Sequence, residues 1–512
     1  MRGAPTSLTA RGLLAGSLAA LMALLPVAAR AQTLSQEARD VAQHAASTYW
    51  EPALSTLADL VAFETVHRSG IPNERNPEFR AMTEYLSTKA GELGFDFADY
   101  GPVVVIGLGE SSDRLGLITH GDVQPADAER WAQNPFTLDT ITEPGLLVGR
   151  GAEDDKGPIA TALYAMKALK DRGLPTKRRI ELIISYTEES DWEPFLEFLE
   201  AHPPPPLNVA LDAEYPVVVA EKGWCLIRLT LPPDPQKPSG DGSLLTLQGG
   251  AFLSQVPAEA RAVVSAPTPE LVNALRAAAH NDPAVDFTFV EGNGSLEIVA
   301  HGVAAHSSKP WDGRNAITHL AALLGTREWP DSQASRMVRL INDLVGLGDY
   351  GERFGEAAYS DPFMGPLTLS LTTLQSEDDG SLTAGINFRR PVGRSGESVE
   401  GTVREAVEAW QRETGIGELE LNLNVNDPYY VEDAPHVPVL LGVFRHYTGR
   451  TEAGAISIGG GTQARLVPNG VNFGPAMPDE VYTGHSEHEY MTRDQLLLNL
   501  KMYTAMLIEL TG

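Results

Sequence analysis

The chain has 512 residues, of which 43% are hydrophobic and 21% are charged. This composition is typical of a folded protein with more than one hydrophobic core, and it excludes a disordered or fibrous chain. The 39 basic residues are outnumbered by 68 acidic ones, so the net charge is -29. Because such a surface repels phosphates and anionic lipid headgroups, we expect neither nucleic acid nor a membrane surface as a partner. The single cysteine, Cys225, excludes an intramolecular disulfide, and we expect it to be buried and non-catalytic.

The first segment, residues 1–31, has the pattern of an export signal. Arg2 and Arg11 precede an apolar run over residues 12–29, and residues 29–31 have the small-x-small pattern that signal peptidase cleaves. The run is short for a membrane span, which needs roughly 20 apolar residues. We therefore predict a cleaved signal peptide instead of a membrane anchor. The mature protein is expected in the periplasm or secreted, with no stable membrane insertion.

The next segment alternates helices and strands. Residues 38–93 are largely helical in pattern, and short apolar runs then alternate with amphipathic helices, which is typical of a mostly parallel α/β sheet. The strands that we predict are Val103–Leu108, Leu115–Thr119, Ile180–Tyr186 and Val209–Leu211. A helix is predicted over Pro158–Arg172, because proline is favoured near a helix start and Gly173 ends the apolar period.

The pattern changes to short strands and helices of the α+β type after residue 221. Strands are predicted at Leu226–Leu231, Ala260–Val264 and Leu296–Ala300, and helices near Pro269–His280 and Asn315–Leu324. The α/β pattern resumes near Asp427, with helices at Val437–Tyr447 and Arg493–Leu510. We therefore predict a catalytic domain in two parts, residues 32–221 and 427–512. The inserted α+β lid domain, residues 222–426, is long enough for two small modules.

Acidic residues and a histidine follow the predicted strands of the first part. His120 and Asp122 follow one strand, Glu188 and Glu189 a second, and Asp212 a third. In an open α/β sheet the carboxyl ends of the strands are where ligands bind. Carboxylates buried this close together need cations, and imidazole with carboxylate but no thiolate favours zinc, manganese or cobalt. The sequence thus predicts a divalent metal site; the alternative is a set of solvated loop acids.

Three motifs carry these residues. They are residues 119–125 (Thr-His-Gly-Asp-Val-Gln-Pro), residues 149–158 (Gly-Arg-Gly-Ala-Glu-Asp-Asp-Lys-Gly-Pro) and residues 187–190 (Thr-Glu-Glu-Ser). All three resemble the signature motifs of the M20 family of metallopeptidases. Within that family the group that includes PepV and carnosinase is most similar. Further matching segments are 211–216, 302–306, 387–391 and 459–462. The resemblance covers nearly the whole chain after residue 31 and implies a mostly parallel-sheet di-metal hydrolase domain with an inserted lid.

The resemblance also implies a set of metal ligands. These are His120, Asp154, Glu189, Asp212 and His485. Asp154 would bridge two divalent ions; His120 and Asp212 would complete one site, and Glu189 with His485 the other. His485 is chosen over His488 because it stands four residues before Glu489, as in the family's His-x-x-x-Glu pattern. Zinc is the first expectation for the ions, with manganese or cobalt as alternatives.

Catalytic and substrate-binding roles follow from the same resemblance. Asp122 would orient His120, and Glu188 would be the general base for an attacking water. His306, in the insert, would stabilise the developing oxyanion. Arg389 would bind the terminal carboxylate of the substrate. Contacts to the substrate are also expected from Ser254, Gly461 and Thr462. The Asp154–Asp155 bond would be a cis peptide.

Three positions bear on the substrate. Asp212, where the deacylating branch of the family tends to have glutamate, favours dipeptides over acylated amino acids. Ser254 stands where the family motif has asparagine, and Gln463 stands where an aromatic residue is expected. These two differences affect the expected side-chain preference and leave the hydrolytic residues intact.

We therefore predict an exported di-metal exopeptidase that cleaves dipeptides or short peptides. A monomer is expected because the insert supplies its own histidine, and a homodimer is the alternative. One rival hypothesis keeps the fold but changes the bond, making the protein an N-acyl-amino-acid amidohydrolase. A second is a non-catalytic periplasmic peptide-binding protein on the same scaffold.

Overall fold

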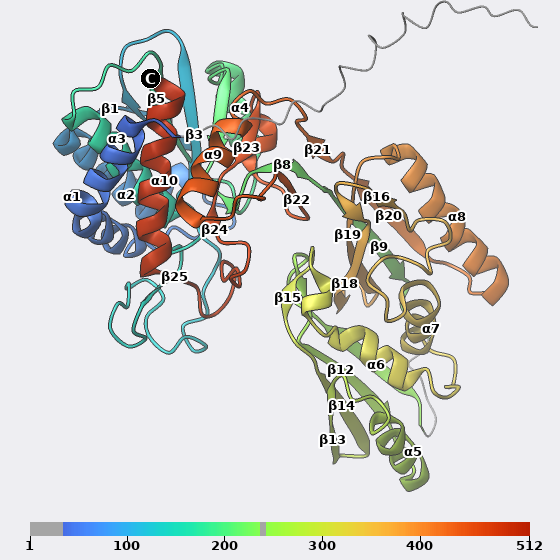
Figure 1. Cartoon of the computed structure of the whole chain (residues 1–512). Coiled ribbons are helices and arrows are strands. Elements are labelled where there is room, and N and C mark those ends of the chain that lie inside the picture. The colour runs from blue at the N-terminus through green and yellow to red at the C-terminus, as the bar shows by residue number, and fades with distance from the viewer. Residues whose placement is uncertain (1–33, 236–241) are drawn as a thin grey trace, which may run out of the picture.

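The computed structural model describes residues 34–235 and 242–512. The predicted signal peptide, residues 1–31, lies outside the described residues. Within the described part, none of the helices has the length and apolar character that crossing a membrane requires. The chain forms two large sheets, which Figure 1 shows side by side, each with its own helices.

The first sheet has nine strands in the order β1-β2-β5-β3-β6-β23-β8-β21, with β22 paired to β8. Their bounds are β1 Asp96–Asp99, β2 Val103–Leu108, β3 Arg114–His120, β5 Arg179–Ser185, β6 Leu207–Ala210, β8 Val218–Glu221, β21 Tyr429–Tyr430, β22 Ile456–Ile458 and β23 Gly470–Asn472. The central strands β5, β3, β6 and β23 are parallel, whereas β1, β2 and β21 join the sheet antiparallel. Strand β8 is antiparallel to β23, and β22 is parallel to β8. The predicted α/β class is confirmed, and the sheet is mixed, with its parallel strands mostly at the centre.

Helices cover both faces of this sheet. On one face lie α1 (Gln36–Val61), α2 (Pro77–Leu93), α3 (Lys156–Asp171), α9 (Val437–Thr448) and α10 (Arg493–Thr511). On the other face lies α4 (Glu193–Ala201). Because side chains alternate along a strand, Leu115 and Leu117 pack under the first group of helices, while Ile118 packs with the α4 side. Both faces are buried, which explains the continuous apolar runs in the sequence.

The second sheet belongs to the insert and is antiparallel throughout, in the order β13-β14-β12-β10-β18-β19-β9-β20. Its strands are β9 Gly223–Leu231, β10 Leu244–Gly249, β12 Glu259–Ser265, β13 Asp286–Gly292, β14 Ser295–His301, β18 Thr368–Ser376, β19 Leu382–Arg390 and β20 Glu420–Val425. Its helices are α5 Pro269–Ala279, α6 Ala316–Leu324, α7 Gln333–Leu340 and α8 Gly396–Thr414. They bury a second core, which is separate from the first.

Short elements complete the fold. Pairs of short strands are β4 (Leu146–Val148) with β25 (Tyr490–Thr492), β7 (Ala213–Glu214) with β24 (Pro475–Ala476), β11 (Gln255–Val256) with β15 (Ala305–His306), and β16 (Ser360–Asp361) with β17 (Gly365–Pro366). Single turns of helix are η1 Asn73–Arg75, η2 Pro310–Asp312, η3 Ile341–Val345 and η4 Gln463–Leu466.

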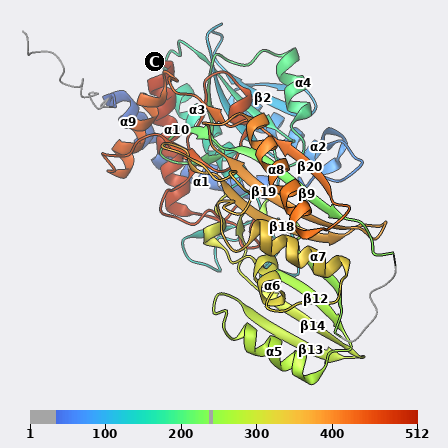
Figure 2. The ribbon, with the colours of Figure 1, turned by 90° about the vertical axis from the view of Figure 1, so that its right-hand side faces the viewer.

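The chain passes between the two sheets twice, at neighbouring places. Strand β8 of the first sheet ends at Glu221 and β9 of the second begins at Gly223, whereas β20 ends at Val425 and β21 begins at Tyr429. Figure 2 shows the insert sheet extending away from the helices of the first sheet. The two connections lie close together, because β8 pairs with β21 and β9 pairs with β20.

The face of the insert sheet that lacks helices is the one that matters for the site. In β19, Leu382, Ala384, Ile386 and Phe388 belong to the core under the helices. By alternation, Asn387 and Arg389 point to the opposite, helix-free face. The loop around His306 reaches this face, since Ser307 Oγ donates to Asn387 Oδ1 at 3.2 Å.

Candidate metal centre

Three parallel strands deliver the acidic cluster to one edge of the first sheet. His120 is the last residue of β3, Glu188 and Glu189 follow β5, and Asp212 follows β6. Because β5, β3 and β6 are parallel neighbours, their carboxyl ends lie side by side. The predicted strand-end residues are therefore brought together by the order of the strands.

Asp154 reaches the same edge from the loop before α3, and Glu489 shapes that loop. One Glu489 carboxylate oxygen accepts from the backbone N–H groups of Glu153 and Asp154, at 3.0 Å each. The other accepts from the Gly151 N–H and from Arg150 Nη1, at 2.9 Å each. The Asp154–Asp155 peptide is cis, as the motif implied. The glutamate of the His-x-x-x-Glu pattern thus has a structural role that the sequence did not reveal.

The cluster divides into two groups that could each hold a cation. His120, Glu188 and Asp212 form one group, and Asp154, Glu189 and His485 form the other, with the ligand atoms of each group within 4.8 Å of one another. Asp154 faces both groups. Its Oδ1 lies 2.8 Å from His120 Nε2, while its Oδ2 lies 3.1 Å from His485 Nε2. A carboxylate with one oxygen directed to each group is suited to bridging two ions.

Other contacts complete the two groups. Asp212 Oδ1 lies 3.5 Å from His120 Nε2, and Glu189 Oε1 lies 3.0 Å from His485 Nε2. The Nε2 atoms of both histidines therefore point to carboxylates, as two sets of metal ligands would. The other nitrogen of His120, Nδ1, lies 3.0 Å from the carbonyl oxygen of Asp122. A partner at Nδ1 leaves Nε2 free to bind a cation.

Asp122 supports the cluster from behind. It is fully buried, and its two carboxylate oxygens accept from the N–H groups of Glu188 at 3.2 Å and Glu189 at 2.9 Å. Its Oδ1 also lies 3.5 Å from His120 Nδ1. Asp122 thus fixes the backbone of both glutamates, in addition to contacting His120, which it was predicted to orient.

The charge of the cluster indicates that it needs cations. Burial, together with neighbouring Asp212, raises the pKa of Glu188 well above its usual range, and burial raises the pKa of Asp212 to about 6. Although burial opposes it, the surrounding carboxylates raise the pKa of His120 and His485 well above the usual value. Carboxylates this crowded must hold protons or cations. Two divalent cations fit these histidine and carboxylate donors, and Cys225 lies buried in the insert, away from them.

The insert places two predicted residues near the cluster. His306 lies on the short strand β15, and its ring centroid is 6.3 Å from that of His485. Arg389 is 4% exposed, with Nε 2.9 Å from Asn387 Oδ1 and Nη2 3.4 Å from Ser307 Oγ. The Ser254 carbonyl accepts from the Ser307 N–H at 2.8 Å, so Ser254 supports the His306 loop through its backbone.

The glycine-rich turn at residues 459–462 borders the same region. Thr462 donates its hydroxyl and its N–H to buried Glu221, at 2.7 and 3.1 Å. A β-carbon placed at Gly459 would lie 2.6 Å from the Ser308 β-carbon, so the turn touches the His306 loop. At Gly461 the nearest group is Arg465 Nη1, 3.2 Å from such a β-carbon. The hydroxyl and the backbone N–H of Thr462 are therefore already used in hydrogen bonds to Glu221.

Comparison with known proteins settles the family. The model of peptidase family M20/M25/M40 matches residues 116–509. The chain belongs to this family. It is 31% identical to a Beta-Ala-Xaa dipeptidase of Lactobacillus delbrueckii subsp. lactis over 466 residues, which are 90% of this chain and 96% of the relative. The resemblance stated from the motifs is confirmed, and the protein is an M20-type metallopeptidase.

Solved structures agree in fold. Human carnosine dipeptidase 1 is similar with a TM-score of 0.57 and 16% identity, over 93% of this chain and 99% of that one. Di-peptidase Dug1p of Saccharomyces cerevisiae is similar with a TM-score of 0.52 and 14% identity, over 91% and 97% of the two chains. The predicted architecture, a catalytic domain with an inserted lid, is that of the M20 peptidases.

Two residues of this M20 centre were missed from the sequence. The Tyr482 hydroxyl donates to Asp154 Oδ2, the oxygen that faces His485, although 37% of the residue remains exposed. Gln124 donates its amide to Glu189 Oε2 at 2.8 Å. Gln124 lay within a recognised motif, whereas Tyr482 belongs to none, and only its place three residues before His485 could have suggested it.

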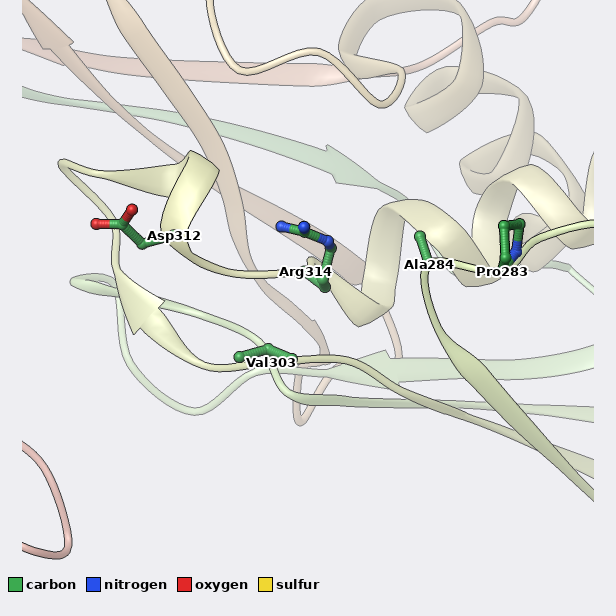
Figure 3. A pocket seen from close by; sticks show the side chains of 5 residues that line it. All are labelled: Pro283, Ala284, Val303, Asp312 and Arg314. Carbon is green, nitrogen blue, oxygen red and sulfur yellow. The ribbon is translucent and has the colours of Figure 1, made fainter.

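A pocket of about 490 Å³ on the insert is a separate feature (Figure 3). It is lined by Pro283, Ala284, Val303, Asp312 and Arg314. It holds no histidine and a single acid, so it cannot form a metal site of the kind described above. Both candidate cation groups therefore lie at the strand edge of the first sheet and not in this pocket.

Proposed function

We propose that the protein is a metal-dependent dipeptidase that hydrolyses the single peptide bond of its substrate. The observation that carries this proposal is the bridging position of Asp154 between two histidine-carboxylate groups, with Glu188 in one of them. The similarity to a relative named as a dipeptidase over nearly its whole length supports the substrate class.

The ligands of the two ions would be His120, Asp154, Glu189, Asp212 and His485. When bound, the ions would polarise the scissile carbonyl and make a water molecule more acidic. Glu188 would accept the proton of that water and pass it to the leaving amine. The pKa of Glu188 is raised well above its usual range, and a base with a raised pKa accepts a proton more readily than an ordinary carboxylate does.

His306 would stabilise the oxyanion through Nε2. The Ser308 N–H donates to His306 Nδ1 at 3.3 Å, and the Ser308 hydroxyl lies 2.7 Å from the same nitrogen. Burial, with Arg389 and His485 nearby, lowers the pKa of His306 well below its usual value, so the ring is neutral. A neutral ring that accepts at Nδ1 carries its proton on Nε2, which makes Nε2 the donor.

Arg389 would bind the carboxylate at the C-terminus of the dipeptide. Its Nη1 makes no hydrogen bond within the described residues and is not fully enclosed. A guanidinium presented in this way can bind a carboxylate through two parallel hydrogen bonds. With the C-terminal carboxylate held by Arg389 and the peptide carbonyl by the metals, a dipeptide would be bound at both ends of the bond between them.

The test is hydrolysis of a dipeptide panel by the mature protein with zinc, manganese or cobalt, with a chelated sample as control. We expect metal-dependent release of free amino acids. Turnover of N-acetyl amino acids instead would support the amidohydrolase, and tight peptide binding without turnover would support a binding protein.

The role of Glu188 is tested by Glu188→Gln. We expect kcat to fall by about 10²- to 10⁴-fold, the usual contribution of general acid-base catalysis. The metal content should stay unchanged, because the ions keep the other ligands. Normal turnover by this variant would refute the proposed mechanism.

Zinc, export and a monomeric state complete the proposal. Histidine and carboxylate donors without thiolate favour zinc, with manganese and cobalt as alternatives.

Export rests on the signal pattern of residues 1–31, and mass spectrometry of the mature N-terminus tests it. A monomer is supported because His306 and the metal ligands belong to one chain. Activity that falls with dilution would indicate a dimer instead.

A further inference from the structure

Two buried cations near the centre have no acidic partner. Arg389 and Lys222 are 4% and 6% exposed. Arg389 donates only to the neutral oxygens of Asn387 and Ser307, and Lys222 Nζ donates only to the carbonyl of Pro366. Neither forms an ion pair within the described part of the chain. A buried cation without a counter-charge is costly, so an anion is expected to bind here.

The two cations lie close together where β9 begins. Arg389 of β19 pairs with Trp224 of β9, and Lys222 immediately precedes this strand. Lys222 Nζ reaches the carbonyl of Pro366, which stands two residues before Thr368 of β18, the other strand partner of Arg389. Burial, with Arg389 nearby, lowers the pKa of Lys222 to about 8, as expected for two cations close together.

Lys222 and Arg389 also border the candidate active site. The Lys222 N–H donates to the carbonyl of Ile458 at 3.0 Å, and Ile458 leads into the glycine-rich turn that touches Ser308. Arg389 contacts Ser307, the residue after His306. A ligand held by both cations would therefore lie beside the residue proposed to stabilise the oxyanion.

A third cation, Arg465, lies near Arg389 and has an acid of its own. Burial, with Arg465 nearby, lowers the pKa of Arg389 to about 10. Arg465 donates to the carbonyl oxygen of Asp427 and lies close to Gly461, where the carboxylate of buried Glu221 faces it. Arg389 and Lys222 are therefore the two cations at this turn that have no acidic partner among the described residues. One carboxylate at Arg389 would leave Lys222 without a partner.

We propose that the preferred substrate has an acidic C-terminal residue, aspartate or glutamate, whose α-carboxylate binds Arg389 and whose side-chain carboxylate binds Lys222. Both carboxylates then belong to one residue, in keeping with two cations that lie close together where β9 begins. The inference rests on the proposed dipeptidase activity and adds a binding site for the side chain.

The first test compares Ala-Asp with Ala-Asn and Ala-Glu with Ala-Gln, pairs that differ only in charge. We expect kcat/KM to be at least about tenfold higher for each acid than for its amide, the scale of one charge-assisted contact. The acid-to-amide ratio should fall close to one in Lys222→Met. The matched control is Lys177→Met, because Lys177 is exposed and lies before β5, at the opposite edge of the sheet. Equal rates for acid and amide in the unmodified protein would overturn the inference.

The second test needs no variant and no turnover. Aspartate and asparagine are titrated into the full-length mature protein without added metal, and binding is followed by calorimetry. Tighter binding of aspartate supports the inference, and equal binding overturns it. If no dipeptide is hydrolysed under any condition, the proposed function fails, but this comparison still decides whether the site prefers a second carboxylate.

Discussion

At the scale of single residues, the metal centre depends on side chains whose partners come from distant parts of the sequence. Asp122 holds the backbone of Glu188 and Glu189, and Glu489 holds the loop of Asp154. Tyr482 adds a donor to Asp154 Oδ2. Burial and the Asp154 carboxylate raise the pKa of Tyr482 well above its usual value, so its hydroxyl stays protonated and can donate.

Tyr482→Phe removes this donor and little else. We expect metal affinity to fall by about 10- to 100-fold, the usual effect of losing a hydrogen bond to a metal ligand. The measurement is a titration against a competing chelator. Tyr350→Phe is the control, because Tyr350 is equally exposed, at 37%, and lies in the insert between η3 and β16. Unchanged affinity in the Tyr482 variant would show that the hydroxyl does not support the metal centre.

His436 gives a prediction about pH and stability. It is 1% exposed, its Nε2 lies 3.1 Å from the carbonyl of Asn208, and burial lowers its pKa to about 4. In the unfolded chain a histidine accepts a proton near pH 6.5. The unfolded state therefore binds more protons between pH 6.5 and 4, and stability is lost as the pH falls through this window.

The loss from His436 should reach about 3 kcal/mol at pH 4, since each pKa unit corresponds to about 1.4 kcal/mol. His436→Gln can still donate to Asn208 but cannot titrate. Its free energy of unfolding, measured with urea, should fall less between pH 7 and 4 than that of the unmodified protein. His446→Gln, an exposed change on the same helix, is the control. Parallel pH curves for all three proteins would contradict the prediction.

At the scale of elements, the site is assembled where the glycine-rich turn of one domain meets the His306 loop of the other. Figure 1 shows β15, which carries His306, on the side of the insert that faces the first sheet. Lys309 Nζ and Glu214 Oε1, one from each side, lie 2.6 Å apart. The position of the donor for the oxyanion thus depends on contacts between elements.

Gly459→Ala tests the contact of the turn with the loop. The added methyl would lie 2.6 Å from the Ser308 β-carbon and would displace the residue that hydrogen-bonds His306 Nδ1. We expect kcat/KM to fall by about 10- to 100-fold, because small misplacements of catalytic groups are costly. Gly460→Ala is the matched control, since the nearest atom to its β-carbon is 3.8 Å away. Equal activity of the two variants would refute the role of this contact.

At the scale of the whole molecule, there are two cores of different type, and the chain runs from one to the other at Lys222 and at residues 426–428. The metal centre belongs to the first core, while His306 and Arg389 come from the second unit. The ions are therefore expected to stabilise the first domain directly and the second only through contacts across the site.

Removal of the metals should abolish hydrolysis and lower the melting temperature. The crowded carboxylates lose their cations, and ions present at about 100 times their Kd contribute about 2.7 kcal/mol. For a domain of this size the expected shift is roughly 5–10 °C. Calorimetry with and without chelator measures it, and restoring zinc should restore both properties. An unchanged melting temperature together with full activity would rule out a metal centre.

The sequence by itself determined the local structure and the chemistry of the centre. The predicted strand Val103–Leu108 is β2 itself, and the predicted helix Pro158–Arg172 differs from α3 by only one or two residues at each end. These features follow from short-range periodicity, turn residues and helix caps. The resemblance of the motifs to those of the M20 family also pointed to histidines and carboxylates that the fold brings together in two candidate cation groups.

Only the tertiary structure decided which distant groups meet. Tyr482 and Glu489 act through hydrogen bonds to residues more than 300 positions away, and the register of β9 and β19 pairs Arg389 with Trp224, close to Lys222. Strand order and register depend on packing across the whole chain, so they cannot be predicted from short-range periodicity. The class of enzyme can therefore be predicted from the sequence, while supporting contacts such as those of Tyr482 and Glu489 are known only from the folded chain.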